Sequence, residues 1–190
     1  MPFDGFFTTL GLAQAVFALV MWVGAFPTRG WISGTTVLGI ITQDLEVGLF
    51  KTSKSGVIVD TKEYFKSQYD SIEATIITLS LGGMFLLTAI GLLCWYFYTP
   101  AARKLGLAYV MCAMMAGVFL MAGVVIFETS FDDVNYIVGY SWYLALFSGL
   151  LSWSSFVTFI TGVKRGERDP HGTPVRGGNQ RKGDRTPLLP

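Results

Sequence analysis

The stretch Ile72-Glu-Ala-Thr-Ile-Ile-Thr-Leu-Ser-Leu-Gly-Gly-Met-Phe-Leu-Leu-Thr-Ala-Ile-Gly-Leu-Leu-Cys-Trp-Tyr-Phe-Tyr98 decides the fold class of this chain. It is longer than the roughly 20 residues that an α-helix needs to cross a hydrocarbon core, and its one formal charge, Glu73, stands at its edge. Three further runs share this character: Phe6 to Phe26, Leu105 to Phe127 and Val138 to Gly162. The sequence therefore predicts an all-α membrane protein, a four-helix transmembrane bundle.

The composition predicts one bundle and one tail. Of the 190 residues, 52% are hydrophobic and 14% are charged, which leaves little for a soluble domain once four spans are counted. We expect the first span to be retained, because residues 1–5 lack the basic region of a signal peptide. Residues 1–162 then form the bundle, and residues 163–190, rich in Gly, Pro, Arg and Lys, form a disordered basic tail.

The basic residues predict the orientation in the membrane. Arg103 and Lys104 lie in the short connection between the second and third runs, and most other basic residues follow the fourth run. Because loops rich in Lys and Arg stay in the cytoplasm, both termini are expected there. This leaves two outer loops, residues 27–71 and 128–137. The chain is therefore predicted to be a multi-pass protein of the plasma membrane.

The first outer loop is long enough to hold its own structure. Leu45 to Phe50 alternates apolar and polar residues, and Val57 to Val59 is a β-branched run. Lys51 to Gly56, between them, has turn composition. We therefore expect a small extracellular β-sheet, followed by a short helix over Thr61 to Ser71.

Small and aromatic residues mark the expected packing of the bundle. Small residues recur at helical spacing in each run: Gly11 and Ala15; Ala74, Thr78 and Gly82; Ala113 and Gly117; and Ser141, Ala145 and Gly149. They are expected at helix interfaces inside the bundle, with a lateral partner interface as the alternative for one group. Aromatic residues near the run ends are interpreted as interfacial anchors: Trp22, Trp31, Trp95, Tyr96, Tyr98, Tyr136, Tyr140 and Trp142.

Residue types that perform chemistry are sparse. His171 is the one histidine and lies in the tail, so no metal cluster or Cys/His or Ser/His arrangement can be assembled. Proton relays and ion pathways need ionisable residues within the spans, and Glu73 alone comes near. Asp70 and Glu73 are a possible cation site, but a solvated helix start is the favoured interpretation. We expect no enzyme, pump or autonomous channel, no cofactor and no nucleic-acid partner.

The order of elements resembles the claudin superfamily, which includes claudins, peripheral myelin and epithelial membrane proteins, and the regulatory gamma subunits of calcium channels and AMPA receptors. The family's first loop carries a Trp, then Gly-Leu-Trp, then two cysteines. Trp31 and Gly48-Leu49-Phe50 stand in that order here, with Phe50 replacing the second Trp. Ser71 to Ser80 and Tyr140-Ser141-Trp142 resemble the entries to the family's second and fourth helices.

The chain departs from the family at the loop cysteines, because its two cysteines, Cys94 and Cys112, lie inside the apolar runs. The predicted sheet must then be held by its hydrogen bonds, by packing of Trp31 with Leu49 or Phe50, or by a partner. The chain also ends Thr186-Pro-Leu-Leu-Pro190, which differs from the PDZ-binding endings of many relatives.

The resemblance implies two classes of function. One is an auxiliary subunit that docks beside a larger channel or receptor and modulates its gating or trafficking. The other is a claudin-type adhesion or paracellular barrier protein, in which four-span proteins associate laterally. The missing cysteines, the altered chain end and the acidic pair Asp132-Asp133 favour the first. Membrane lipid is a partner in both.

Two peripheral sites complete the predictions. Cys94 is a candidate for palmitoylation, although a buried, inert thiol is the favoured interpretation. Asp184 with Leu188 and Leu189 resembles an acidic dileucine sorting signal, a short pattern that also arises by chance.

Overall fold

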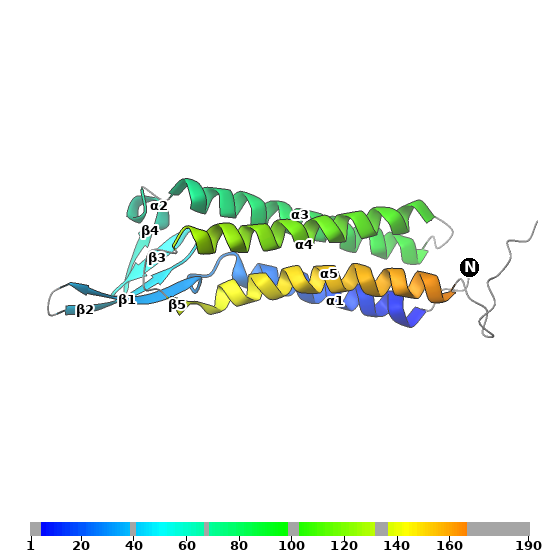
Figure 1. The fold of residues 1–190 in the computed structure, drawn as a ribbon, viewed down its shortest axis with the longest axis horizontal. Coiled ribbons are helices and arrows are strands. Elements are labelled where there is room, and N and C mark those ends of the chain that lie inside the picture. Colours follow the sequence, from blue (N-terminus) through cyan, green and yellow to red (C-terminus); the bar gives the residue numbers. More distant parts are fainter. Residues whose placement is uncertain (1–4, 39–40, 67–68, 99–102, 132–136, 167–190) are drawn as a thin grey trace, which may run out of the picture.

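The computed structural model describes residues 5–38, 41–66, 69–98, 103–131 and 137–166. The helices are α1 (Gly5–Ala25), α2 (Thr61–Tyr64), α3 (Tyr69–Tyr98), α4 (Arg103–Thr129) and α5 (Tyr140–Gly166). The strands are β1 (Ile32–Leu38), β2 (Ile41–Val47), β3 (Lys51–Lys54), β4 (Val57–Asp60) and β5 (Ile137–Val138). Four long helices run side by side, and the sheet lies at one end of them (Figure 1).

The four long helices confirm the predicted helical runs, with small changes at their ends. Each is long and apolar enough to cross a membrane. α3 begins at Tyr69 rather than Ile72, and α5 continues to Gly166, beyond the predicted end at Gly162. α3 packs most extensively on α4 and α1 on α5, while α4 and α5 join the two pairs (Figure 1).

The strands form one antiparallel sheet in the order β4-β3-β2-β1-β5. A small sheet in the first outer loop was predicted, and it is present. The predicted turn over Lys51 to Gly56 was wrong, because Lys51–Lys54 is a strand that pairs with both β2 and β4. The turn consists of Ser55 and Gly56, whose φ angles of 48° and 84° fit the tight hairpin turns that match strand twist.

The second outer loop adds an unpredicted strand to this sheet. β5 pairs with β1 through Ile32 opposite Val138 and Ser33 opposite Ile137. Val138 was predicted to begin the fourth helical run, because an apolar residue next to a long apolar run carries no local sign of a strand. α5 consequently begins at Tyr140 instead.

Within the described residues, the helix expected over Thr61 to Ser71 is shorter, because α2 ends at Tyr64 and Tyr69 to Ser71 belong to α3. Asp60 caps α2 by accepting a hydrogen bond from the backbone N–H of Lys62 at 2.9 Å. The side chain of Thr61 is buried and donates to the carbonyl of Gly48 at 3.0 Å. The Thr61 bond fastens the end of β4 to the turn between β2 and β3.

Candidate recognition surface at the sheet end of the bundle

Trp31 fastens the sheet to the helices. Its side chain is fully buried, and its indole N–H donates to the carbonyl of Ala25, the last residue of α1, at 2.9 Å. Its ring centroid lies 4.9 Å from that of Phe127 in α4. Its backbone N–H donates to Val47 at the end of β2. The interpretation of Trp31 as an interfacial anchor was therefore wrong, since this one residue joins α1, α4 and the sheet.

Trp22, which was interpreted as an interfacial anchor, also contacts a neighbouring helix. Its indole N–H donates to the backbone carbonyl of Leu79 in α3 at 3.0 Å, and a Cβ at Gly83 would lie 2.3 Å from its ring. Trp22 thus fills the space between α1 and α3, which a glycine in α3 leaves open. Its position near the end of an apolar run did not distinguish this packing role from a headgroup contact.

Gly48, Leu49 and Phe50, the predicted loop motif, have three different environments. A Cβ at Gly48 would lie 2.7 Å from the carbonyl oxygen of Thr28, so the backbones approach too closely for a side chain. Leu49 is buried in the same cluster as Trp31. Phe50 is 41% exposed and makes an edge-to-face contact with Phe26. Leu49, rather than Phe50, occupies the core position beside Trp31.

The second outer loop is held to the first by backbone contacts at two glycines. The N–H of Gly139 donates to the carbonyl of Trp31 at 2.8 Å, and the N–H of Ser141 donates to the carbonyl of Gly30 at 2.9 Å. A Cβ at Gly139 would lie 2.1 Å from the Gly30 carbonyl oxygen. The Ser141 and Thr28 hydroxyls also share a hydrogen bond of 2.6 Å. The sheet and the segment that leads into α5 therefore form one structural unit.

The outward surface of this unit carries apolar residues at both edges of the sheet. Val57 and Ile58 of β4 are 65% and 55% exposed, and within the described residues β4 pairs with β3 alone. Ile137 of β5, at the other edge, is 73% exposed. Sheet edges are usually protected by charged side chains or covered by other segments, so exposed β-branched residues there indicate a contact surface. Val57–Asp60 is called the β4 edge below.

Serine hydroxyls inside the bundle were missed by the sequence analysis. Ser148, Ser152 and Ser155 of α5 are fully buried and donate to backbone carbonyls of neighbouring helices at 2.6 to 2.8 Å. Ser148 and Ser155 bond to α1, whereas Ser152 bonds to α4. The hydroxyl of Tyr109 in α4 also bonds to Ser155. The available signal was their spacing of four and three residues, which places all three on one helical face.

The glycines among the predicted interface residues lie against neighbouring helices. A Cβ at Gly82 would lie 2.8 Å from Leu120, and one at Gly117 would lie 2.2 Å from the ring of Trp153. For Gly11 the nearest atom is the Ser155 carbonyl oxygen at 3.3 Å, and for Gly149 it is in Met121 at 3.1 Å.

The other small residues that were predicted at helix interfaces lie in two kinds of environment. Four are fully buried: Ala15, Ala113, Ser141 and Ala145. Ala74 and Thr78 are half-buried, and the Thr78 hydroxyl donates to the carbonyl of Ala74 within α3 at 2.7 Å. Thr78 also faces α4, since a Cβ at Gly123 would lie 3.1 Å from its hydroxyl oxygen.

The other candidate residues lie away from the sheet or outside the described chain. Cys94 is exposed on α3, so its interpretation as a buried thiol was wrong. Asp70 and Glu73 are exposed in the first turns of α3. Asp184, Leu188 and Leu189 lie outside the described residues. In the described part of the chain, no group of three or more His, Cys, Asp or Glu side chains is placed to hold a metal ion.

Comparison with known proteins does not assign the chain to a family. No protein-family model matches it, and a search of curated proteins gives no significant match.

Proposed function

We propose that the four long helices cross the plasma membrane and that the protein is a non-enzymatic auxiliary subunit, which docks beside a channel or receptor and modulates its gating or trafficking. The observation that carries this proposal is the fastening of the sheet to the helices. Trp31 joins the sheet to α1 and α4, and the hydrogen bond from the Ser141 N–H to the Gly30 carbonyl joins it to α5. A partner that binds the sheet would therefore be held at a defined position beside the bundle.

The interior of the bundle supports a packing role. Its buried serine hydroxyls are engaged by backbone carbonyls of adjacent helices. In a lipid environment such bonds, together with close approach at glycines, stabilise helix association without a hydrophobic driving force. The bundle then serves as a scaffold that holds the sheet at the membrane surface.

The proposed orientation has both termini in the cytoplasm and the sheet outside. The sheet lies at the end where α1 finishes and α5 begins, opposite the end near Arg103 and Lys104 (Figure 1). The positive-inside rule assigns that basic end to the cytoplasm.

Membership of the claudin superfamily is part of this proposal. It is supported by the residues that match the family's first-loop motif, because these lie together. Trp31 and Leu49 belong to one buried cluster, and Gly48 forms the turn beside them. Hydrogen bonds between strands and the indole contact take the place of the family's loop disulfide.

The β4 edge is the proposed contact with the partner's extracellular domain. Its unpaired side can accept a strand from another protein, with Val57 and Ile58 supplying apolar contacts. The exposed faces of α1 and α3 to α5 are apolar as well, which suits contact with lipid or with transmembrane helices of a partner.

The test is co-purification of the tagged full-length chain from its native membrane in mild detergent. We expect one channel or receptor at fixed stoichiometry. The double variant Val57→Thr/Ile58→Thr keeps strand propensity but removes apolar surface, and we expect it to lose that partner. Ile137→Thr, at the far edge of the sheet, is the matched control and should retain it.

Two outcomes of this test would refute the auxiliary role. One is the absence of a stoichiometric channel or receptor from the purified material. The other is the formation of intercellular strands by cells that express this chain alone, which is the behaviour of a barrier protein.

A further inference from the structure

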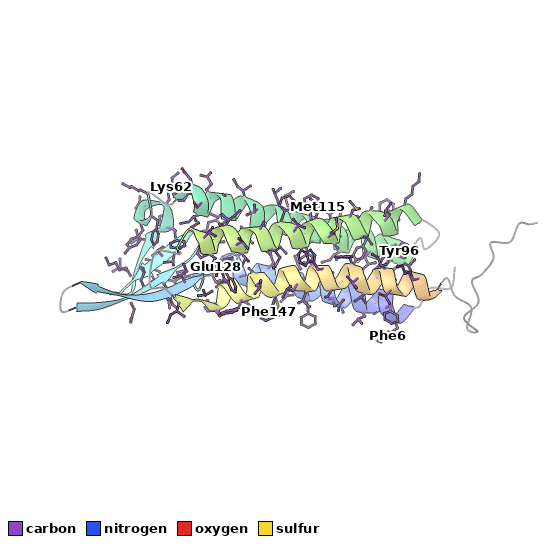
Figure 2. The ribbon with its side chains drawn as sticks, in the orientation of Figure 1. Phe6, Lys62, Tyr96, Met115, Glu128 and Phe147 are labelled. Carbon is purple, nitrogen blue, oxygen red and sulfur yellow. The ribbon has the colours of Figure 1, made fainter. Side chains whose placement is uncertain are left out.

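A shallow cavity of about 470 Å³, open to solvent, lies where α2 approaches the start of α3. It is lined by Lys62, Glu63, Lys66, Tyr69 and Asp70. Figure 2 shows Lys62 beside α2, at the sheet end of the molecule. The cavity is distinct from the β4 edge, and the proposed docking of a partner assigns it no role.

The position of this cavity along α3 places it at the level of lipid headgroups, given the proposed membrane crossing. α3 has 30 residues. At 1.5 Å per residue it is about 45 Å long, which matches the roughly 40–45 Å of a bilayer with its headgroup regions. The first turn of α3, with Tyr69 and Asp70, then lies among the headgroups.

The charges that line the cavity balance. Lys62 and Lys66 supply two ammonium groups, and Glu63 and Asp70 supply two carboxylates. Within the described residues, no ion pair joins these four side chains. The ammonium of Lys62 lies 5.0 Å from the ring centroid of Tyr69, a cation–π contact that holds this charge at the cavity wall.

This balance favours one class of ligand. An anionic headgroup would gain from the two lysines but would meet both carboxylates. A zwitterionic headgroup carries a phosphate and an amine, so each of its charges finds opposite charge on the wall.

An apolar surface continues from the cavity along α3. Ile77, Leu81 and Met84 are exposed, and their spacing from Asp70 places them on the same helical face. A lipid whose headgroup occupied the cavity would lay an acyl chain against this face. The polar and apolar parts of a phospholipid therefore both have a matching surface in the correct order.

We propose that this cavity binds the headgroup of a zwitterionic glycerophospholipid. The phosphate lies between Lys62 and Lys66, the amine faces Glu63 and Asp70, and an acyl chain follows the exposed face of α3.

The first test uses the unaltered full-length chain in mild detergent. Phosphatidylcholine and phosphatidylglycerol with identical short acyl chains are added at equal concentration, and the bound lipid is measured by native mass spectrometry. We expect phosphatidylcholine to be retained about tenfold more, a ratio that corresponds to about 1.4 kcal/mol. Equal retention of the two lipids, or preference for phosphatidylglycerol, would overturn the proposal.

The second test uses variants of equal charge change. Lys62→Gln/Lys66→Gln should reduce retention of phosphatidylcholine about tenfold. Arg29→Gln/Lys51→Gln, with one change before β1 and one on β3, removes the same charge outside the cavity lining and should leave retention unchanged. Circular dichroism and a single elution peak check the fold of both variants. An equal loss in both would show that the lysines act through overall charge, and would contradict a defined site.

No protein partner is present in either of these lipid-binding measurements. A failure of lipid binding therefore leaves the proposed docking role intact, and a failure to recover a channel or receptor leaves the lipid site intact.

Discussion

The substitution Gly139→Ala tests whether the contact between the two outer loops holds the sheet on the bundle. The added Cβ would lie 2.1 Å from the carbonyl oxygen of Gly30. Because that atom belongs to the backbone, no side-chain rotation relieves the overlap, and one loop must shift away from the other. The shift would break or lengthen the hydrogen bonds from Gly139 to Trp31 and from Ser141 to Gly30.

The expected loss in the free energy of unfolding comes from the steric overlap and from the loss of the two hydrogen bonds. Overpacking typically costs about 1–3 kcal/mol, and each lost hydrogen bond about 0.5–1.5 kcal/mol. The expected loss in the free energy of unfolding is therefore about 2–6 kcal/mol. At roughly 2–4 °C per kcal/mol for a chain of this size, the melting temperature should fall by about 4–24 °C.

The assay is thermal unfolding of the full-length chain in one detergent, followed as the fraction that elutes as a single peak after heating. Gly91→Ala is the matched control, because a Cβ there meets no heavy atom within 4 Å. Alanine is favoured over glycine inside a helix by about 0.5–1 kcal/mol, so this variant should melt slightly higher. An unchanged melting temperature for Gly139→Ala, or an equal fall for Gly91→Ala, would refute the reasoning.

Three further predictions concern the bundle, the sheet and the tail. Ser155→Ala should destabilise the chain by about 1–3 kcal/mol, because it removes a buried donor to the α1 backbone. Ser154→Ala, whose hydroxyl bonds within its own helix, should change stability by less than about 0.5 kcal/mol in the same melting assay. Trp31→Phe loses the bond to Ala25 and part of a buried ring, so we expect a loss of about 2–4 kcal/mol in that assay. Protease added to the cytosolic side of sealed vesicles should remove residues 167–190, and survival of this segment would contradict a cytoplasmic C-terminus.

The helices were predictable because each is encoded by a long apolar run. A run such as Phe6 to Phe26 forms a helix without contacts from another segment, since its length and lack of charge alone favour a helix in lipid. Its ends were less predictable. Tyr69 to Ser71 joined α3 although this segment is more polar than the run that follows it.

The sheet was only partly predictable because its strands are defined by their neighbours. Lys51-Thr-Ser-Lys54 has the composition of a turn, yet it lies between β2 and β4 and receives hydrogen bonds from both sides. Ile32–Leu38 has little alternation, but it forms the centre of the pairing between β2 and β5. Pairing of this kind depends on the register between distant segments, which local composition does not encode.

The candidate recognition surface was likewise only partly predictable from the sequence. Trp31, Gly48 and Leu49 could be singled out from their order in the chain, but the exposure of Val57 and Ile58 at a sheet edge could not. The five residues around the cavity, by contrast, are close in the chain: Lys62 and Glu63 belong to α2, Lys66 follows it, and Tyr69 and Asp70 begin α3.

The sequence by itself determined the number of long helices and the charge asymmetry between the two ends of the bundle, because both depend on composition within continuous segments. Tertiary structure alone decided which residues fill the core, how the second outer loop completes the sheet, and where charged and apolar surfaces meet. Those features arise from contacts such as Gly30 with Gly139, whose two residues are distant in the chain and carry no local signal of their proximity.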